Sequence, residues 1–227
     1  MTEQVIHKFP KPTRTSYSAL TTFEACPLSY MLYYLDGHKT EAGAAANRGT
    51  RLHEACEKFL KGEIEITKLS IDFFKIKQLL QHYKDLGAKA EEVWLCDNDG
   101  NYQEEENAAT RFKAVVDIHY VIGKTLYIVD LKTGRAYPEH ADQLQAYATI
   151  GFARYPEVEA VEVAPLYLEG LGHPTGYNRA FHPHLVNFWR GRWDKLFDTN
   201  EYPATPSLDA CRYCQYRASK MGLCVYG

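Results

Sequence analysis

The order of the expected elements indicates an α/β fold with a mixed central β-sheet flanked by helices. Two runs rich in β-branched and aromatic residues lie on either side of Gly123-Lys124 and read as a hairpin. A helical segment follows at 138–153, and a further strand is expected at 158–168. The hairpin is antiparallel, whereas a strand reached through a crossover helix is parallel to its predecessor. One sheet therefore contains both kinds of pairing.

The other segments are expected to be mostly helical. Ser16 or Ser18 can N-cap a first helix, which Cys26-Pro27 ends. Apolar spacing predicts further helices at 28–35, 47–61 and 185–197, and a helical excursion at 62–90. We expect a strand at 91–96, a turn at 97–100, a glycine-rich loop at 170–176 and an extended arm at 1–14.

Length and composition limit the classes of protein. A chain of 227 residues fits one domain, 1–227, with a helical insertion at about 62–90 and a cysteine-containing tail at about 205–227. The net charge of −3 gives no bulk basic field, so binding to nucleic acid must use local patches. No apolar run approaches the ~18 residues of a membrane span, and the first ten residues lack the apolar core of a signal peptide. We therefore expect a cytoplasmic protein whose six cysteines are reduced or metal-bound.

Three charged groups converge on one side of the hairpin. If Gly123-Lys124 form the tight turn, Asp117 and Asp130 face each other, ~5 Å apart at Cβ, and Lys132 shares their face. Two close carboxylates repel unless a cation sits between them, and such oxygen ligands suit Mg²⁺ or Mn²⁺. A surface hairpin with a salt bridge is the alternative reading.

Further motifs agree in order and spacing. The chain contains Gly49-Thr-Arg-Leu-His53, then Asp117, then Asp130-Leu-Lys-Thr-Gly134, then Gln143-Leu-Gln-Ala-Tyr147. This set resembles the RecB-type branch of the PD-(D/E)xK nuclease superfamily, and the match touches residues from about 16 to 224. The resemblance implies a restriction-endonuclease-like core. Val116 stands where the superfamily name has proline, which is a structural and not a chemical position.

The resemblance also assigns roles. Asp117 and Asp130 are implied as metal ligands, with the Leu131 carbonyl and His53 as further ligands. Lys132 would orient or deprotonate the attacking water and screen charge, because phosphodiester hydrolysis needs both. Gln143 and Tyr147, one helical turn apart, would position Lys132 and the DNA backbone. A lone helix histidine such as His53 would otherwise be read as a hydrogen-bonded core or surface residue.

Four cysteines form a second pattern. Cys211 and Cys214 make a C-x-x-C pair in the tail, Cys224 follows them, and Cys26 precedes a proline near the start. Four thiolates can bind zinc or a 4Fe-4S cluster. The split of one cysteine before the core and three after it resembles the iron–sulfur staple of CRISPR-adaptation nucleases and AddB-type helicase–nucleases. We expect a 4Fe-4S cluster that joins the N- and C-terminal segments, with zinc as the alternative, and ordinary buried thiols at Cys56 and Cys96.

These observations predict a Mg²⁺- or Mn²⁺-dependent DNA nuclease, most simply an exonuclease, that acts on single strands or duplex ends. The resemblance implies roles in recombination, repair, CRISPR adaptation or phage DNA processing, with a helicase or recombination partner and no membrane association. Two alternatives stay open: a nucleic-acid-binding module without catalysis, and a zinc-stapled interaction protein.

Overall fold

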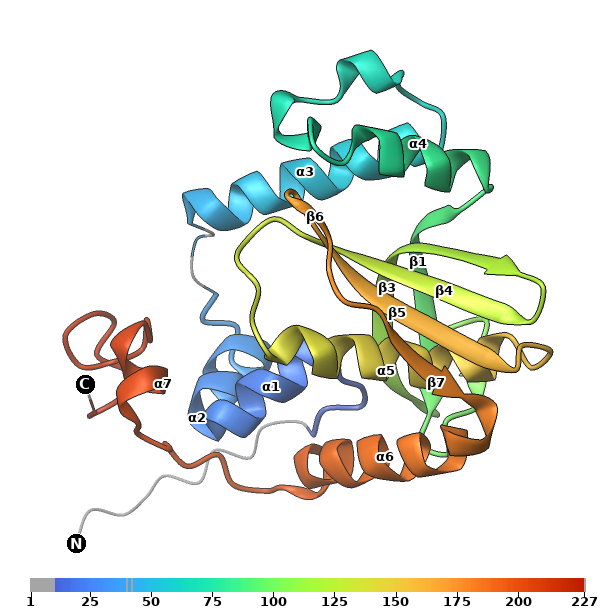
Figure 1. Cartoon of the computed structure of the whole chain (residues 1–227). Coiled ribbons are helices and arrows are strands. Elements are labelled where there is room, and N and C mark those ends of the chain that lie inside the picture. Colours follow the sequence, from blue (N-terminus) through green and yellow to red (C-terminus); the bar gives the residue numbers. More distant parts are fainter. Residues whose placement is uncertain (1–10, 40, 42, 227) are drawn as a thin grey trace, which may run out of the picture. The chain divides into compact units, whose positions relative to one another are not determined.

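A computed structural model describes residues 11–39, 41 and 43–226 (Figure 1). The chain divides into two compact units. We call Ala42–Arg190 the sheet unit, and Met1–Glu41 together with Gly191–Gly227 the terminal unit. The first ten residues of the expected arm lie outside the described residues. Within the described part of the chain, no helix is long and apolar enough to cross a membrane.

The sheet unit is built on a seven-stranded mixed sheet, and the predicted α/β fold is confirmed (Figure 1). Its path runs β2-β1-β3-β4-β5-β6, and β7 also pairs with β5. The strand bounds are β1 Lys89–Asp97, β2 Tyr102–Gln103, β3 Thr110–Ile122, β4 Thr125–Lys132, β5 Ala160–Tyr167, β6 Gly170–Leu171 and β7 Thr175–Asn178. Strands β4 and β5 pair in parallel, and the other strand pairs of the described residues are antiparallel.

The central hairpin has the predicted register. Ile122 pairs with Thr125 across a two-residue turn, and the ladder continues to the pair Ile118–Val129. Gly123 has φ +59, a left-handed value that glycine adopts without steric cost and that a primed hairpin turn needs. Helix α5 (Glu139–Arg154) then carries the chain from β4 to β5, which makes this pair parallel as expected.

One face of the sheet packs on helices α3 (Ala44–Leu60) and α4 (Lys77–Asp85) (Figure 1). Ile118, Val129 and Leu131 meet Cys56 and Phe59 of α3 in one buried cluster. The segment expected as an excursion contains two 3₁₀ turns, Ile66–Lys68 and Ile71–Phe73, before α4. It adds buried side chains to the same cluster: Leu69, Phe73, Ile76, Leu80 and Tyr83. These residues help to form the core, and whether they are an insertion stays a prediction.

Helix α5 packs closely on the opposite face. A Cβ added at Gly151 would lie 2.7 Å from a methyl carbon of Leu126 and 3.3 Å from one of Ile128. Leu126 and Ile128 are fully buried on β4. The glycine therefore lets the helix approach the strand that carries Asp130 and Lys132, and it sets the depth of α5 over the sheet.

The prediction of a glycine-rich loop at 170–176 is partly wrong, because this part of the chain contributes to two short strands. Gly170 and Leu171 pair with Tyr167 and Leu166, and Thr175–Asn178 pairs with the first half of β5. Strand-forming residues are few there, so the pairing depends on the edge that β5 offers and not on local propensity.

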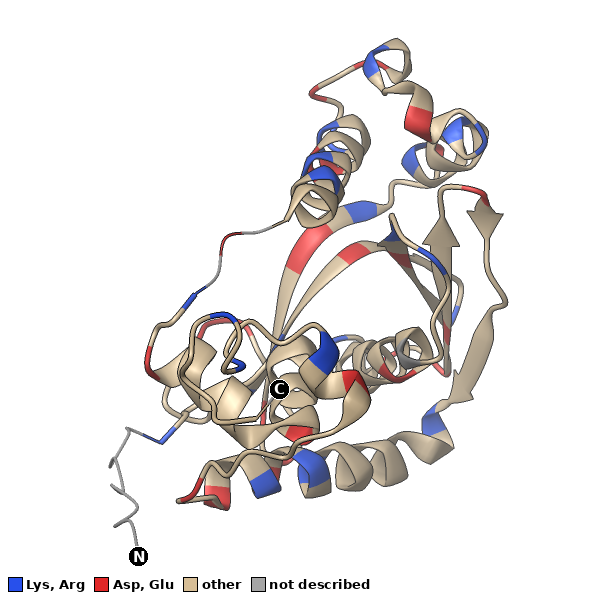
Figure 2. Ribbon diagram, turned by 90° about the vertical axis from the view of Figure 1, so that its left-hand side faces the viewer, with Lys and Arg blue, Asp and Glu red and all other residues tan. Residues whose placement is uncertain are grey.

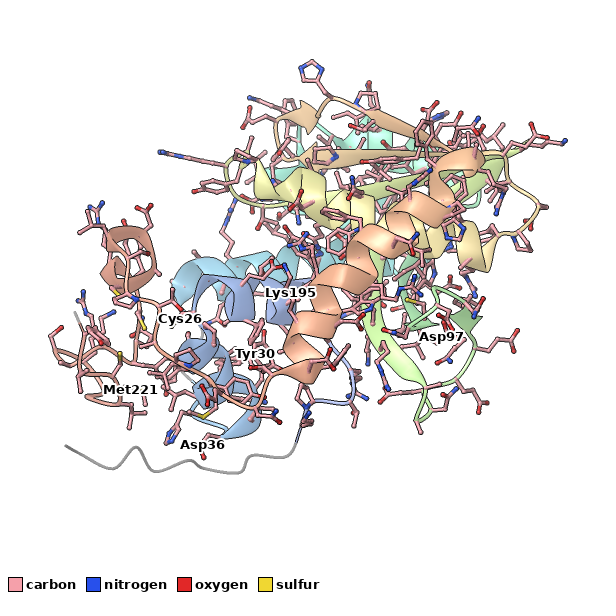
Figure 3. All side chains as sticks on the ribbon, turned by 90° about the horizontal axis from the view of Figure 1, so that it is seen from below. Cys26, Tyr30, Asp36, Asp97, Lys195 and Met221 are labelled. Carbon is pink, nitrogen blue, oxygen red and sulfur yellow. The ribbon has the colours of Figure 1, made fainter. Side chains whose placement is uncertain are left out.

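The terminal unit contains α1 (Tyr17–Ala25), α2 (Pro27–Tyr30), a π-helical turn (Met31–Leu35), the second half of α6 (His182–Asp198) and α7 (Leu208–Arg212). Ser16 caps α1, and its side chain accepts a hydrogen bond from the Ala19 N–H. Tyr30, labelled in Figure 3, stacks on Tyr202 with ring centroids 6.2 Å apart. The Leu28 N–H donates to the Pro203 carbonyl at 3.2 Å. Segments from the two ends of the chain thus pack together in this unit.

The close approach at Gly151 generates a stability prediction. Replacing a helical glycine with alanine normally stabilises a helix by about 1 kcal/mol, but overpacking a core costs about 1–3 kcal/mol. We expect Gly151→Ala to lower the free energy of unfolding, measured by urea denaturation. Gly191→Ala on α6 is the matched control, because nothing lies within 4 Å of its added Cβ. A Gly151→Ala protein that gains as much stability as Gly191→Ala would contradict the close packing of α5.

Candidate active site

A histidine and two carboxylates meet at one end of the sheet. His53 projects from α3, Glu91 from β1 and Asp117 from β3. His53 Nδ1 lies 3.4 Å from Glu91 Oε1 and 3.4 Å from Asp117 Oδ2. One ligand atom from each of the three side chains lies within 4.8 Å of the others. Three elements that are distant in sequence thus supply one compact group of donor atoms.

The register of β1 against β3 explains why Glu91 is there. Ala90 pairs with Ile118 and Glu92 with Val116, so Glu91 stands opposite Asp117. Glu91 has φ +51, the only positive value of a non-glycine residue within the described chain. Such a conformation costs of order 1–3 kcal/mol and persists only where the surroundings impose it.

Side chains on either side of this strained residue lie on different faces of the sheet. Ala90 joins the buried cluster under α3 and α4. Glu92, two residues later, instead approaches His119 and Arg154 of the α5 side, with contacts of 3.2 and 3.0 Å. In a regular strand, residues i and i+2 project to the same face of the sheet. The irregularity at Glu91 therefore breaks the alternation beside Asp117.

Directly beyond the last hairpin pair, Ile118–Val129, the next residues on the two strands are Asp117 on β3 and Asp130 on β4. Asp117 Oδ2 accepts a hydrogen bond of 2.7 Å from the Leu131 N–H, so the side chain occupies the place where a backbone pair would form. Asp130 is only 2% exposed. Its burial, followed by the charge of Asp117, raises the pKa of the Asp130 carboxyl to about 7, although Lys132 opposes this shift.

Lys132 is held by a chain of polar contacts. Its Nζ lies 2.6 Å from Asp130 Oδ2 and donates to Gln143 Oε1 at 2.7 Å. Gln143 Nε2 in turn donates to Tyr147 Oη at 2.6 Å. Tyr147 is buried, and burial together with the charges of Asp130 and Asp117 raises the pKa of its phenol. The ammonium group is therefore fixed by partners on β4 and α5.

The charge balance around His53 is strongly negative. Burial by itself would lower the pKa of the imidazole, but hydrogen bonding and attraction to Asp117 and Glu91 outweigh burial and raise the pKa to about 10. Cys56, one helical turn away, is buried; burial and the same two carboxylates raise the pKa of its thiol to about 12. The carboxylates thus favour any cationic group that enters their vicinity.

Gly49 lets α3 approach the end of β4. A Cβ at this position would meet Thr133 Oγ1 at 3.2 Å, closer than most side-chain contacts. Next to it, Arg48 Nη1 donates to the Thr133 carbonyl at 3.4 Å and Nη2 to Asp72 Oδ1 at 2.6 Å. The glycine of the G-x-x-x-H motif therefore sets the distance between His53 and the strand of Lys132.

The donor set fits a divalent metal ion. Carboxylate oxygens are preferred by Mg²⁺ and Mn²⁺, and an imidazole nitrogen suits the transition metals. The Leu131 N–H donates a hydrogen bond to Asp117, so the Leu131 peptide group lies beside the donor set. In Figure 2, acidic and basic segments lie close together on neighbouring strands of the sheet.

The residues that the motifs selected fall into two sets of contacts: His53 and Asp117 belong to the donor group, whereas Asp130 lies outside that group and contacts Lys132. The selected residues in the sheet unit are His53, Asp117, Asp130, Leu131, Lys132, Gln143 and Tyr147. Arg135 is exposed on the loop after β4. Glu91 was missed. A pairing of the strand at 91–96 with the central hairpin could have suggested it, but no fixed spacing revealed the register.

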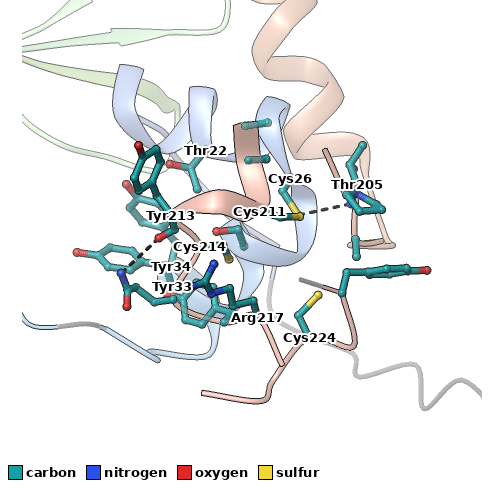
Figure 4. Close-up of a pocket in the computed structure, with 18 residues that line it drawn as sticks. Thr22, Cys26, Tyr33, Tyr34, Thr205, Cys211, Tyr213, Cys214, Arg217 and Cys224 are labelled. Atoms are coloured by element: carbon teal, nitrogen blue, oxygen red, sulfur yellow. Dashed lines mark hydrogen bonds between the residues drawn. The ribbon is translucent and has the colours of Figure 1, made fainter. Parts of the chain in front are cut away.

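The four cysteines of the second pattern lie in the terminal unit (Figure 4). Cys26, Cys211, Cys214 and Cys224 line one pocket of about 390 Å³. Cys26 Sγ accepts a hydrogen bond from the Thr205 N–H at 3.5 Å. Cys56 and Cys96 are buried in the sheet unit, which confirms them as buried thiols.

Comparison with solved structures shows a shared fold. A protein from Eubacterium rectale, whose own description as an exonuclease is provisional, superposes with a TM-score of 0.53 at 14% identity, over 94% of this chain and 93% of that chain. The crystal structure of SSO0001 gives a TM-score of 0.47 at 14% identity, over 91% of this chain and 85% of that chain. Among curated proteins, no significant match was found.

The sequence as a whole matches one family profile. The profile described as PD-(D/E)XK nuclease superfamily covers residues 14–219, which is most of the chain. The matched range includes two contacting pairs of the site, His53 with Asp117 and Lys132 with Asp130. The chain therefore belongs to the PD-(D/E)XK nuclease superfamily.

Proposed function

We propose that the protein is a metal-dependent deoxyribonuclease that hydrolyses phosphodiester bonds, with exonuclease action on single strands or duplex ends. The observation that carries this proposal is the group of His53, Glu91 and Asp117 donor atoms beside a lysine held by Asp130 and Gln143. The exonuclease description of the Eubacterium rectale protein supports the choice of exonuclease action.

The residues divide into a cation-binding set and a water-positioning set. His53, Glu91, Asp117, Asp130 and the Leu131 carbonyl would hold Mg²⁺ or Mn²⁺. Such an ion neutralises charge on the scissile phosphate and lowers the pKa of a bound water. Lys132 adds a fixed positive charge beside the carboxylates and orients or deprotonates the attacking water. Gln143 and Tyr147 keep the lysine in place through their two hydrogen bonds.

The biological setting follows from the RecB-type resemblance. We propose a cytoplasmic enzyme of recombination, repair, CRISPR adaptation or phage DNA processing, which can act beside a helicase or recombination partner. The spacing from Asp117 to Lys132 and the Gln143–Tyr147 pair support the RecB-type branch, because Gln143 contacts Lys132 directly.

A 4Fe-4S cluster in the terminal unit is the second part of the proposal. Four thiolates can hold a 4Fe-4S cluster, and Cys26, Cys211, Cys214 and Cys224 all line one pocket of about 390 Å³ in the terminal unit. The cluster would contribute to folding, not to bond cleavage.

Catalysis gives the first functional prediction. Lys132→Ala and Asp130→Asn should each lower cleavage of labelled single- and double-stranded DNA by roughly 100-fold or more, because a preorganised charge beside the reacting phosphate is lost. The assay contains Mg²⁺ or Mn²⁺, and chelator should abolish the activity of the unchanged protein. Lys124→Ala is the matched control: this lysine lies at the turn of the same hairpin, is mostly exposed and pairs with Glu159. Turnover equal to wild type in either site variant would refute the assigned roles.

Cation binding gives the second functional prediction. Glu91→Gln removes one of the three acidic or imidazole donors while keeping its size. We expect Mn²⁺ affinity, measured by calorimetry, to fall roughly tenfold or more. Glu162→Gln is the control, because Glu162 is exposed on β5. If Glu91→Gln binds Mn²⁺ as tightly as Glu162→Gln, Glu91 is not a ligand.

The four cysteines of the terminal unit give the third functional prediction. Protein purified without oxygen should be brown and contain about four iron and four sulfide per chain. Cys26→Ala should lose the iron and much of the soluble yield, whereas Ser29→Ala, which alters the same pocket without removing a thiol, should retain both. Colourless protein with stoichiometric zinc would overturn the cluster and leave the nuclease proposal intact.

A further inference from the structure

Three aromatic side chains form a line that leads from solvent toward the catalytic lysine. They are Tyr137 in the loop after β4, His140 at the start of α5 and Tyr167 at the end of β5. We call these three residues the aromatic run. None of them belongs to the donor group or to the Lys132–Gln143–Tyr147 chain.

The inner end of the aromatic run lies beside the active site. The parallel register of β4 and β5 sets Tyr167 next to Lys132. Residues paired in this way project to the same face of a sheet. Burial and, to a smaller extent, the negative charge of Asp130 raise the pKa of the Tyr167 phenol.

The middle and outer rings are fixed in position. His140 Nδ1 and Tyr167 Oη form a hydrogen bond of 3.1 Å, and the ring centroids lie 6.0 Å apart. Tyr137 meets His140 edge to face, with centroids 5.7 Å apart and an interplanar angle of 86°. The His140 N–H also donates to the Tyr137 carbonyl at 3.1 Å, which holds the backbone of Tyr137 at the start of α5.

Tyr137 is nevertheless largely exposed to solvent. Its relative exposure is 57%, although it is anchored by His140 on one side. Arg135, two residues earlier on the same loop, is also exposed. A single exposed tyrosine is ordinary. Here the exposed ring contacts His140, His140 contacts Tyr167, and Tyr167 pairs with Lys132. This series of contacts connects the exposed ring to the active site.

The net charge of the chain indicates how an aromatic surface could contribute to nucleic-acid affinity. With a formal charge of −3, the protein has no large basic field to attract a polyanion. Affinity for a nucleic acid then depends on local basic groups and on direct contacts with the bases. Stacking on aromatic rings is such a direct contact, and it is available only to unpaired bases, whose faces are not already covered.

We propose that the aromatic run is a stacking site for unpaired bases of the strand that is cut, so that the enzyme prefers single-stranded DNA or frayed ends to paired duplex. This inference rests on the proposed nuclease function. Tyr137 takes the outer base, and the run guides the strand toward Lys132. Arg135 lies on the same loop, where it can meet the phosphate that links successive nucleotides.

The test separates binding from cleavage. Binding of a fluorescently labelled single-stranded oligonucleotide is measured by anisotropy with Ca²⁺ in place of Mg²⁺, so that the strand stays intact. We expect Tyr137→Ala to weaken binding roughly tenfold, the loss of about one stacked base. Tyr137→Phe keeps the ring and should bind like wild type. Phe181→Ala is the control for loss of an exposed ring elsewhere in the sheet unit, where Phe181 is 61% exposed, and should also bind like wild type.

A second readout reports stacking directly. An oligonucleotide with 2-aminopurine near its end should lose fluorescence on binding to the wild-type protein and keep it on binding to Tyr137→Ala. Equal single-strand affinity in wild type and Tyr137→Ala overturns the inference, and so does an equal loss of affinity for single strands and for blunt duplex. If the unchanged protein neither binds nor cuts DNA, the proposed function fails as well. Cleavage by wild type together with unaltered Tyr137→Ala binding refutes the stacking site alone.

Discussion

Repulsion between carboxylates is the constraint on which the rest of the site depends. Glu91, Asp117 and Asp130 stand at one level of three neighbouring strands, where the β1–β3 and β3–β4 registers bring them together. Like charges at this separation are unfavourable unless a positive group intervenes. The protein supplies two such groups, His53 between Glu91 and Asp117, and Lys132 against Asp130. A divalent cation is a stronger solution to the same problem, and the high pKa of His53 reflects the pull of the carboxylates on any positive charge.

The fold positions these groups through close contacts on both faces of the sheet. On one face, α3 brings His53 to the carboxylates, and Gly49 lets the helix approach Thr133. On the other, Gly151 lets α5 approach β4, so that Gln143 reaches Lys132. The strained Glu91 backbone costs free energy that this packing offsets, since the preceding residue, Ala90, is buried in the cluster under α3 and α4. Stability in the sheet unit and preorganisation of the site therefore have a common source.

Much of this arrangement could be predicted because it depends on local sequence. The glycine at the hairpin turn sets the register, and this register brings Asp117 and Asp130 to the positions directly beyond the pair Ile118–Val129. The spacing of Gln143 and Tyr147 is a property of one helix. Glu91 was missed because its place depends on β1–β3 pairing, which joins distant segments and contains a register shift between Cys96 and Asp97. The strands β6 and β7 were missed because β5 provides their edge, not their own composition. The meeting of Tyr137, His140 and Tyr167 likewise needs the parallel β4–β5 register.

The most direct test of this account is the position of a bound manganese ion. A crystal of the protein grown with Mn²⁺ gives an anomalous signal that locates the ion without assumptions about its ligands. We expect one ion within bonding distance of Asp117 and Glu91, with His53 turned from a proton-sharing partner into a ligand or an immediate neighbour. An ion bound elsewhere on the sheet unit, in crystals of protein that cuts DNA in the same buffer, would contradict the claim that the carboxylate cluster exists to hold the catalytic cation.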